Sequence, residues 1–366
     1  MSLNCGIVGL PNVGKSTLFN ALTSTQKAQS ANYPFCTIEP NKGIVSVPDE
    51  RLQALANIAG SKNILPTRLE FIDIAGLVKG ASKGEGLGNQ FLSNIRETDA
   101  IIHVLRCFDD SNIIHVEETV DPIRDAEIVN TELMLADLEA LEKRIVGLEK
   151  KAKTGDKEAK EQADLINKIL PVLQLGKMAY TLEFTTEEQK TLRSLFLITS
   201  KPVLYVCNVA ESDVVDGNKY VDLVKEYAKT QNTPVVIICA KIEEEIANLE
   251  QESDKAEYLE TLGLKQSGLD KIIQEGYKLL KLQTYFTVGP KETRAWTIKQ
   301  NTNAQIAAGE IHSDIERGFI AAEVISYGDY VSLGGEAKAK ESGKVKIEGK
   351  TYIVKDGDVI LFRFNV

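Results

Sequence analysis

The stretch Gly9-Leu10-Pro11-Asn12-Val13-Gly14-Lys15-Ser16-Thr17 has the residue types and the spacing of a phosphate-binding loop. Two glycines bracket four residues, and a lysine and a hydroxyl residue follow directly. Backbone N–H groups of such a loop point at a phosphate, and the N-terminus of the next helix adds partial positive charge. Lys15 would span the β- and γ-phosphates, and the Ser16 hydroxyl would bind Mg²⁺. The pattern predicts that the chain binds a nucleoside triphosphate.

Two further motifs could complete a magnesium site. Asp73-Ile74-Ala75-Gly76 follows an apolar run, so the Asp73 carboxylate can hold Mg²⁺ through water and the Gly76 N–H can sense the γ-phosphate. Thr37 lies between the first expected helix and the next strand, and its hydroxyl would complete the Mg²⁺ shell only in the triphosphate state. The predicted metal ligands are therefore Ser16, Thr37 and Asp73.

The sequence Asn208-Val209-Ala210-Glu211 stands where nucleotide switches recognise the base. Guanine-specific switches carry Asn-Lys-x-Asp there, and the aspartate accepts two hydrogen bonds from guanine. Here Val209 replaces the lysine and Glu211 replaces the aspartate, so the pairing that selects guanine is degraded. These residues predict weak selectivity for guanine.

Hydrolysis requires a positioned water, and switches of the Ras kind place a glutamine just after Asp-x-x-Gly to orient it. Leu77 occupies that position and cannot orient water. Several phosphate-loop proteins that lack the glutamine carry an asparagine at the place of Asn12, where its amide oxygen helps to hold K⁺ beside the phosphates. We therefore expect K⁺ to assist hydrolysis. His115 follows the strand 101–105; a lone histidine between apolar neighbours is more often structural than catalytic.

The elements that must position these residues alternate between strands and helices. Short apolar runs rich in β-branched residues predict strands at 5–8, 43–47, 69–72, 101–105, 203–206 and 235–238. This order is typical of an α/β fold with a mostly parallel sheet and helices on both faces. Ligands of such sheets bind at the carboxyl ends of the strands, which is where every motif above lies.

A helical segment separates the two groups of strands. Apolar residues from Met134 to Leu148 repeat in alternating steps of four and three, and the spacing resumes after Thr154-Gly155-Asp156, which predicts an antiparallel helical hairpin. Lysines crowd its tip, and a solvated charged surface is the plainer interpretation of them than a nucleic-acid contact.

After Leu280 the pattern changes to a small α+β domain. Runs at 282–287 and 295–298 predict two strands around Gly289-Pro290, and 314–321 predicts a helix. Residues 352–354 and 359–364 flank Asp356-Gly357-Asp358 and predict a hairpin.

The bulk composition limits the class of protein. Among 366 residues the net charge is −10, which argues against coating nucleic acid by charge alone. The five cysteines are scattered without ligand spacing, which favours reduced thiols. The first strand leaves no room for a signal peptide, and no apolar run approaches a membrane span, so we expect a cytoplasmic protein with no membrane partner.

Longer stretches make the chain resemble the YchF family of Obg-like ATPases, which are translation-factor-class phosphate-loop proteins. They are NYPFCTIEPN at 32–41, DIAGLVKGASKGEGLG at 73–88, NQFLSNIRET at 89–98, NIIHV at 112–116, and the carboxy-terminal LQTYFTVG, RAWT and YIVKDGDVILFRFNV. The resemblance covers essentially the whole chain. It implies a nucleotide domain over 1–280 with a helical insertion at 131–198, and a β-grasp TGS domain over 281–366.

The resemblance also implies an activity and partners. A YchF protein is expected to prefer ATP, contacted by Asn208, Val209 and Glu211, and to hydrolyse it with His115 as the catalytic residue. It is expected to bind ribosomes, chiefly the large subunit, with RNA contacts through the TGS domain and the helical arm. Two alternatives stay open: a GTPase of ribosome assembly, and an RNA-binding protein whose nucleotide is structural. A small-molecule kinase is disfavoured because the sequence shows no acceptor-binding lid.

Overall fold

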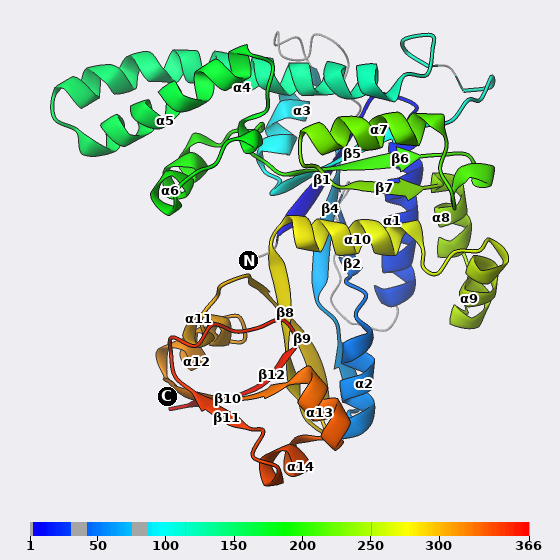
Figure 1. Cartoon of the computed structure of the whole chain (residues 1–366), viewed down its shortest axis with the longest axis vertical. Helices are drawn as coiled ribbons and strands as arrows, with labels where there is room; N and C mark the ends of the chain where they lie inside the picture. The colour runs from blue at the N-terminus through cyan, green and yellow to red at the C-terminus, as the bar shows by residue number, and fades with distance from the viewer. Residues whose placement is uncertain (1–2, 31–41, 75–86, 114, 250, 366) are drawn as a thin grey trace. The chain divides into compact units, whose positions relative to one another are not determined.

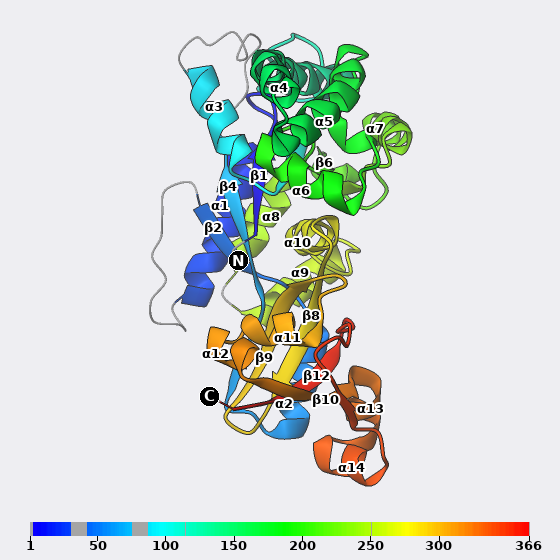
Figure 2. The same cartoon turned by 90° about the vertical axis from the view of Figure 1, so that its left-hand side faces the viewer.

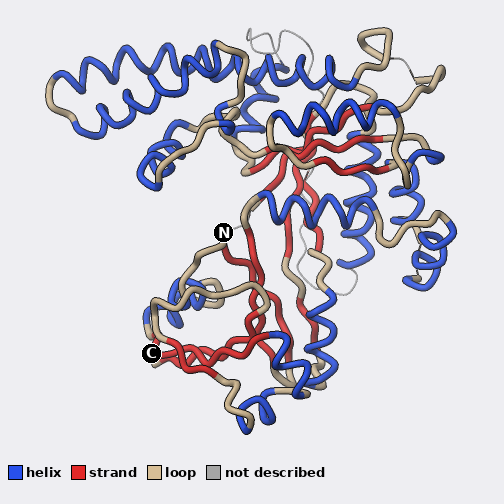
Figure 3. The backbone as a smooth tube through the Cα atoms, in the orientation of Figure 1, coloured by secondary structure: helices blue, strands red, loops and turns tan. Residues whose placement is uncertain are grey.

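The computed structural model describes the chain except for residues 1–2, 31–41, 75–86, 114, 250 and 366 (Figure 1). Two compact units form it: Met1–Ile44 with Glu70–Ile272, and Val45–Leu69 with Ile273–Val366. Each unit has its own six-stranded sheet, whose strands are red in Figure 3. The proposed division at residue 280 stays a prediction, and the second unit also takes in the segment 45–69.

The first unit is built on a mostly parallel sheet in the order β2-β4-β1-β5-β6-β7. Its strands are β1 (Asn4–Val8), β2 (Lys42–Ser46), β4 (Arg68–Asp73), β5 (Ala100–Arg106), β6 (Val203–Asn208) and β7 (Val235–Ile238). The pairs of β1 with β4 and β5, of β5 with β6 and of β6 with β7 are parallel. The chain order reverses at β1, and a ligand site is expected at such a switch point.

Helices cover both faces of this sheet (Figure 1). The helices of this unit are α1 (Lys15–Ser30), α3 (Leu87–Arg96), α4 (Pro122–Lys153), α5 (Lys157–Gln174), α6 (Thr186–Leu195), α7 (Lys219–Thr230), α8 (Ala240–Ala247) and α9 (Glu252–Thr261), and α10 (Gly268–Leu279) continues into the second unit. β5 and β6 are buried at every position, as central parallel strands must be. The predicted α/β fold is confirmed.

The predicted helical hairpin is also confirmed. α4 and α5 lie side by side in both views (Figures 1 and 2). Their seam buries Leu141 and Ile166 of the predicted periodic pattern, together with Ile169, which the pattern did not include. Asp156 ends the turn between them by accepting a hydrogen bond from the Ala159 N–H at the start of α5.

The second unit is an α+β layer structure. Its sheet runs β11-β10-β12-β8-β9-β3, formed by β3 (Asn63–Leu65), β8 (Leu282–Val288), β9 (Glu292–Lys299), β10 (Phe319–Ser326), β11 (Lys346–Glu348) and β12 (Asp358–Phe364). Its helices are α2 (Glu50–Ala59), α11 (Ala304–Gly309), α12 (Ser313–Arg317), α13 (Tyr327–Leu333) and α14 (Glu336–Glu341).

Alternating side chains of this sheet enter two separate cores, as the period of a strand requires. Tyr285 and Ile360 pack with the alanines of α11, whereas Phe286 and Val359 pack with Leu55 of α2. Helices therefore cover both faces.

Two local predictions for this unit are wrong. Residues 352–354 do not pair with β12, because β12 pairs with β10 and β8 and the Asp358 carboxylate turns back to accept the Lys355 N–H. The helix expected over 314–321 ends at Arg317, and Phe319 begins β10, where a buried central strand outweighs local helix propensity.

Candidate nucleotide-binding site

The phosphate loop joins the end of β1 to the start of α1, as predicted. Gly9, Asn12 and Gly14 have φ values of 157°, 61° and 100°, which lie in the region that favours residues without a bulky side chain. A Cβ on Gly14 would lie 2.2 Å from Asn208 Nδ2, so this position requires glycine on two grounds. Pro11, Asn12 and Val13 lie between the glycines, and Lys15, Ser16 and Thr17 form the first turn of α1.

Lys15 and Asp73 come together from neighbouring strands of the sheet. Ile7, two residues before the loop, pairs with Asp73 at the end of β4. Lys15 is buried, its Nζ donates to the Leu10 carbonyl at 2.6 Å, and burial lowers its pKa to about 8 while Asp73 opposes that shift. Burial raises the pKa of the Asp73 carboxyl, and the nearby Lys15 ammonium counteracts it. The Lys15 ammonium and the Asp73 carboxylate therefore lie close enough for each to shift the pKa of the other.

The side-chain oxygens of Ser16 and Asp73, beside the phosphate loop, fit a magnesium ion. Ser16 is exposed in the first turn of α1, and Asp73 ends the adjacent strand β4. A hydroxyl and a carboxylate are the ligands that Mg²⁺ prefers, with water and phosphate oxygens filling its other positions. The predicted third ligand, Thr37, and the predicted γ-phosphate sensor, Gly76, lie outside the described residues, as does Leu77.

A pocket of about 530 Å³ lies beside the loop at the carboxyl ends of β5, β6 and β7. Its lining includes Asn12, Gly14 and Thr17 of the phosphate-loop region, Asn208–Glu211 after β6, and Cys239–Lys241 after β7. Val209 is buried, whereas Glu211 is exposed and its carboxylate lies 3.6 Å from Lys241 Nζ. The structure therefore brings the predicted base-recognition residues to the predicted phosphate loop.

Asn208 ties the pocket together through its amide. Its Nδ2 donates to the Val13 carbonyl at 3.0 Å, and its Oδ1 accepts the Ala240 N–H at 2.9 Å. One side chain thus connects the phosphate loop, the end of β6 and the start of α8. Both polar atoms of this amide already hold backbone groups of the protein.

His115 is buried in the loop between β5 and α4, and both of its ring nitrogens are engaged. Nδ1 accepts the Glu117 N–H at 3.1 Å, so Nε2 carries the proton and donates to Asp125 Oδ2 at 2.8 Å. Burial raises the pKa of the Asp125 carboxyl, while His115 and Arg124 oppose that shift. His115 is not one of the described residues that line the 530 Å³ pocket.

Two residues that hold this region together were not predicted from the sequence. Asp125, in the first turn of α4, is the carboxylate partner of His115. Arg106, the last residue of β5, is buried and donates to three backbone carbonyls of the following loop. An acidic residue at a helix start and a basic residue at a strand end are common features, so no pattern marked either one.

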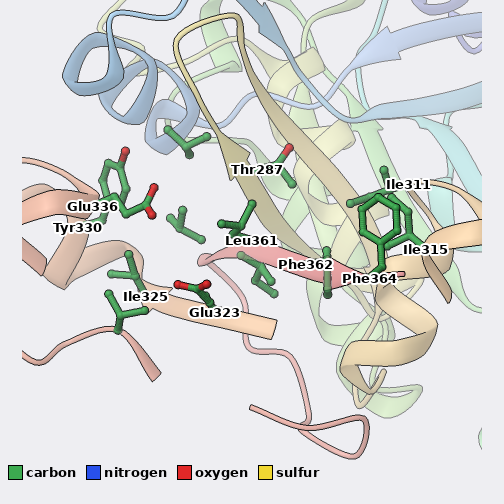
Figure 4. A pocket seen from close by; sticks show the side chains of 14 residues that line it. Thr287, Ile311, Ile315, Glu323, Ile325, Tyr330, Glu336, Leu361, Phe362 and Phe364 are labelled. Carbon is green, nitrogen blue, oxygen red and sulfur yellow. The ribbon is translucent and has the colours of Figure 1, made fainter. Parts of the chain in front are cut away.

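The second unit has a cavity of about 210 Å³ of a different character (Figure 4). Aliphatic and aromatic side chains such as Ile325, Leu361 and Phe362 line most of it, together with Thr287, Glu323 and Glu336. Of the predicted site residues that the structure describes, none lines this cavity.

Comparisons with known proteins agree with this geometry. A family model described as "50S ribosome-binding GTPase" matches residues 4–150, and YchF-GTPase_C, described as "Protein of unknown function (DUF933)", matches residues 282–365. Among the described residues, no helix is long and apolar enough to cross a membrane.

The relatives match over the full length. The chain is 57% identical to a protein of Bacillus subtilis and 55% identical to one of Haemophilus influenzae, each covering 100% of both sequences and each named "Ribosome-binding ATPase YchF". It is also similar to the solved structure of the Schizosaccharomyces pombe YchF GTPase, with a TM-score of 0.89, 39% identity, and coverage of 99% of this chain and 98% of that one. With this agreement in sequence and in fold, the chain belongs to the YchF family.

Proposed function

We propose that this protein is an ATPase that binds ATP in preference to GTP, hydrolyses it to ADP and phosphate, and associates with the ribosome. The observation that carries the proposal is the adjoining pair of sites: the phosphate loop with the buried Lys15, and the 530 Å³ pocket at Asn208–Glu211. Lys15 and the backbone N–H groups of residues 12–17 bind the triphosphate, in the loop that begins with Pro11. The relatives' name, "Ribosome-binding ATPase YchF", supports the assignment.

The preference for ATP follows from the pocket's chemistry. Val209 is an apolar residue of the pocket lining, and the Glu211 carboxylate lies 3.6 Å from Lys241 Nζ. A carboxylate only accepts hydrogen bonds, so its value for reading guanine depends on its reaching the two guanine donors. The Glu211 carboxylate stands on a side chain longer than that of aspartate and lies beside Lys241, and both features weaken its recognition of guanine.

The metal is proposed to be Mg²⁺, held by Ser16, Thr37 and Asp73. When bound it would offset the negative charge of the phosphates during transfer. Within the chain, Asp73 also balances the Lys15 ammonium, and Gly76 is proposed to contact the γ-phosphate through its N–H. We further propose that Asn12 helps to hold K⁺. Faster hydrolysis in K⁺ than in Na⁺, abolished by Asn12→Ala, would support this role, and equal rates would refute it.

His115 is the proposed catalytic residue that aligns the attacking water. Its nitrogens bind Asp125 and the Glu117 N–H, so it must exchange at least one of these hydrogen bonds before it can contact water. Neutral imidazole suits the task because one nitrogen can accept a proton.

The proposed partner is the large ribosomal subunit, which the description "50S ribosome-binding GTPase" of the family model over residues 4–150 supports. RNA contacts are proposed through the lysine-rich tip of the α4–α5 arm and through the TGS domain, residues 281–366. Lys150, Lys151, Lys153, Lys157 and Lys160 are all exposed. We place the protein in the cytoplasm, where ribosomes work; the described cysteines are free thiols.

A second candidate is a GTPase. It is favoured by the description of the family model over residues 4–150 and by the name of the fission-yeast structure, both of which say GTPase. Phosphate release from ATP and from GTP should be measured with and without ribosomes, using the full-length chain. The proposal expects ribosomes to increase ATP turnover more than GTP turnover. ATP turnover that ignores ribosomes, or faster GTP turnover, would reject it.

A further inference from the structure

The 530 Å³ pocket at the ends of β5, β6 and β7, which we call the base pocket, has walls of two different kinds. One wall consists of Asn208–Glu211, which begins at the last residue of β6, and of Cys239–Lys241, which directly follows β7; the two strands fix its position. The facing wall consists of Phe108, Asp109, Asp110 and Ile113, which belong to no strand or helix. An irregular wall needs another source of rigidity if it is to hold a base in one position.

Arg106 supplies that source of rigidity. Its Nε donates to the Phe108 carbonyl at 3.2 Å, Nη2 to the Asp110 carbonyl at 3.1 Å, and Nη1 to the Ile113 carbonyl at 3.0 Å. The guanidinium also lies 4.7 Å from the centre of the Phe108 ring. A planar group with five N–H donors in a fixed geometry can set the relative positions of three carbonyls.

The cost of burying Arg106 points to a specific role. The residue is 2% exposed, and a buried cation is tolerated only where hydrogen bonds replace its water. All three of its bonds go to residues that line the pocket, namely Phe108, Asp110 and Ile113. A side chain that only filled the core would not need hydrogen-bond partners that all line the pocket.

Other hydrogen bonds also hold the loop, beginning with the Cys107 N–H, which donates to the Asn208 carbonyl at 2.8 Å. Asn218 Nδ2 holds the Cys107 carbonyl, and the Tyr220 hydroxyl holds the exposed Asp109 carboxylate. These two bonds connect the loop to the start of α7. Within the segment from Asp110 to Ile113, the Ile113 N–H donates to the Asp110 carbonyl at 3.3 Å and the Asn112 N–H donates to the Asp110 carboxylate at 2.8 Å. Arg106 adds the hydrogen bonds that connect this segment to the end of β5.

We propose that Arg106 is a positioning residue for base recognition: it holds the loop wall of the pocket at the spacing that a purine ring requires. The inference rests on the proposed nucleotide function of the same site. Arg106 makes its hydrogen bonds to the loop wall at Phe108, Asp110 and Ile113, whereas the Lys15 ammonium donates to the Leu10 carbonyl within the phosphate loop. Loosening the wall should therefore weaken binding of the base and leave binding of the phosphates intact.

The test compares ligands with and without a base. Arg106→Lys keeps the charge but loses the three-pronged donor, and Arg106→Gln avoids burying an ammonium. Arg144→Lys is the matched control, because Arg144 also holds a backbone carbonyl, that of Ser194, but in the helical arm. Dissociation constants for ATP, GTP and inorganic tripolyphosphate are measured on full-length protein by displacement of a ribose-labelled fluorescent ATP, after circular dichroism has checked folding.

The proposal predicts that both Arg106 variants bind ATP roughly tenfold more weakly, the loss expected for a few weakened hydrogen bonds. The ratio of ATP to GTP affinity should fall toward one, and tripolyphosphate should bind as it does to the parent. Arg144→Lys should change none of these values. Unchanged ATP affinity, an equal loss for ATP and tripolyphosphate, or failure of both Arg106 variants to fold would each overturn the proposal. If the parent itself does not bind ATP, it is the proposed function that fails.

Discussion

Lys15 shows how a functional residue can cost stability. Burial lowers its pKa from 10.5 to about 8, with Asp73 opposing, so the folded chain holds this proton less tightly than the unfolded chain does. Between these two pH values the unfolded state binds more protons, and the contribution of Lys15 to the free energy of unfolding rises with pH. At neutral pH the buried ammonium is therefore a net cost.

Lys15→Met should remove that cost and the function together. We expect the variant to lose ATP binding but to gain about 1–3 kcal/mol in the free energy of unfolding at pH 7. Urea unfolding of nucleotide-free parent and variant at pH 7 and pH 10 measures this difference in the free energy of unfolding. The difference should be smaller at pH 10. A variant that is less stable than the parent at pH 7, or a difference that is the same at both pH values, would contradict this account of Lys15.

His115 sits in a closed set of hydrogen bonds with Asp125 and Glu117. If it aligns the attacking water, His115→Ala should leave ATP affinity near normal and lower the turnover of bound ATP about 100-fold, the loss typical of a missing general base. Single-turnover hydrolysis with and without ribosomes measures this effect. A fall in affinity without a fall in turnover would make His115 part of the binding scaffold.

At the scale of elements, the site depends on how the ends of strands are joined. Asn208 connects the phosphate loop to β6 and α8, and Gly14 must lack a Cβ because the Asn208 amide lies against it. The phosphate loop is therefore positioned from the neighbouring strands as well as from its own helix.

Asn208→Ala should consequently weaken ATP and inorganic tripolyphosphate alike. Losing both amide hydrogen bonds frees the Val13 carbonyl, and we expect a roughly tenfold rise in both dissociation constants. The displacement titration described for Arg106 measures it. Glu211→Ala serves as the comparison, since the Glu211 carboxylate pairs with Lys241 and its loss should spare tripolyphosphate. Weakening of ATP alone in Asn208→Ala would show that Asn208 reads only the base.

The elements that the sequence predicted are those with a local signal. The glycines and Lys15 define a strand–loop–helix unit by themselves, and the apolar seam from Met134 to Leu173 defines the hairpin by its spacing. Arg106 and Asp125 could not be predicted, because their roles come from contacts that only the folded loop creates. The predicted hairpin at 352–364 was wrong because β12 pairs with β10 and β8, and these long-range pairings leave no signal in the local sequence.

At the scale of the whole molecule, the chain crosses between its two units more than once. β2 and β4 belong to the first sheet, but the segment between them carries α2 and β3, and β3 pairs with β9 in the second sheet. Leu52 and Leu55 of α2 are buried in the same core as Phe286 and Val359. A single cut of the sequence therefore cannot separate the two cores.

Ending the chain at residue 280 should expose the apolar face of α2 and leave β3 unpaired. We expect the fragment 1–280 to bind the dye ANS and to associate, both of which exposed apolar surface promotes. Replacing Leu52 and Leu55 by serine should reduce these effects in the fragment. Dye fluorescence and size-exclusion chromatography measure them. A fragment that stays monomeric and does not bind the dye would contradict the inclusion of α2 in the second core.

The measurement that tests the account most directly is a competition titration of ATP against GTP on the full-length chain, with Lys15→Ala as the control. The account predicts that ATP displaces a fluorescent nucleotide at lower concentration than GTP does, and that Lys15→Ala binds neither although it stays folded. Tighter binding of GTP would contradict the assignment of the base pocket. Undiminished ATP binding by Lys15→Ala would contradict the nucleotide site itself.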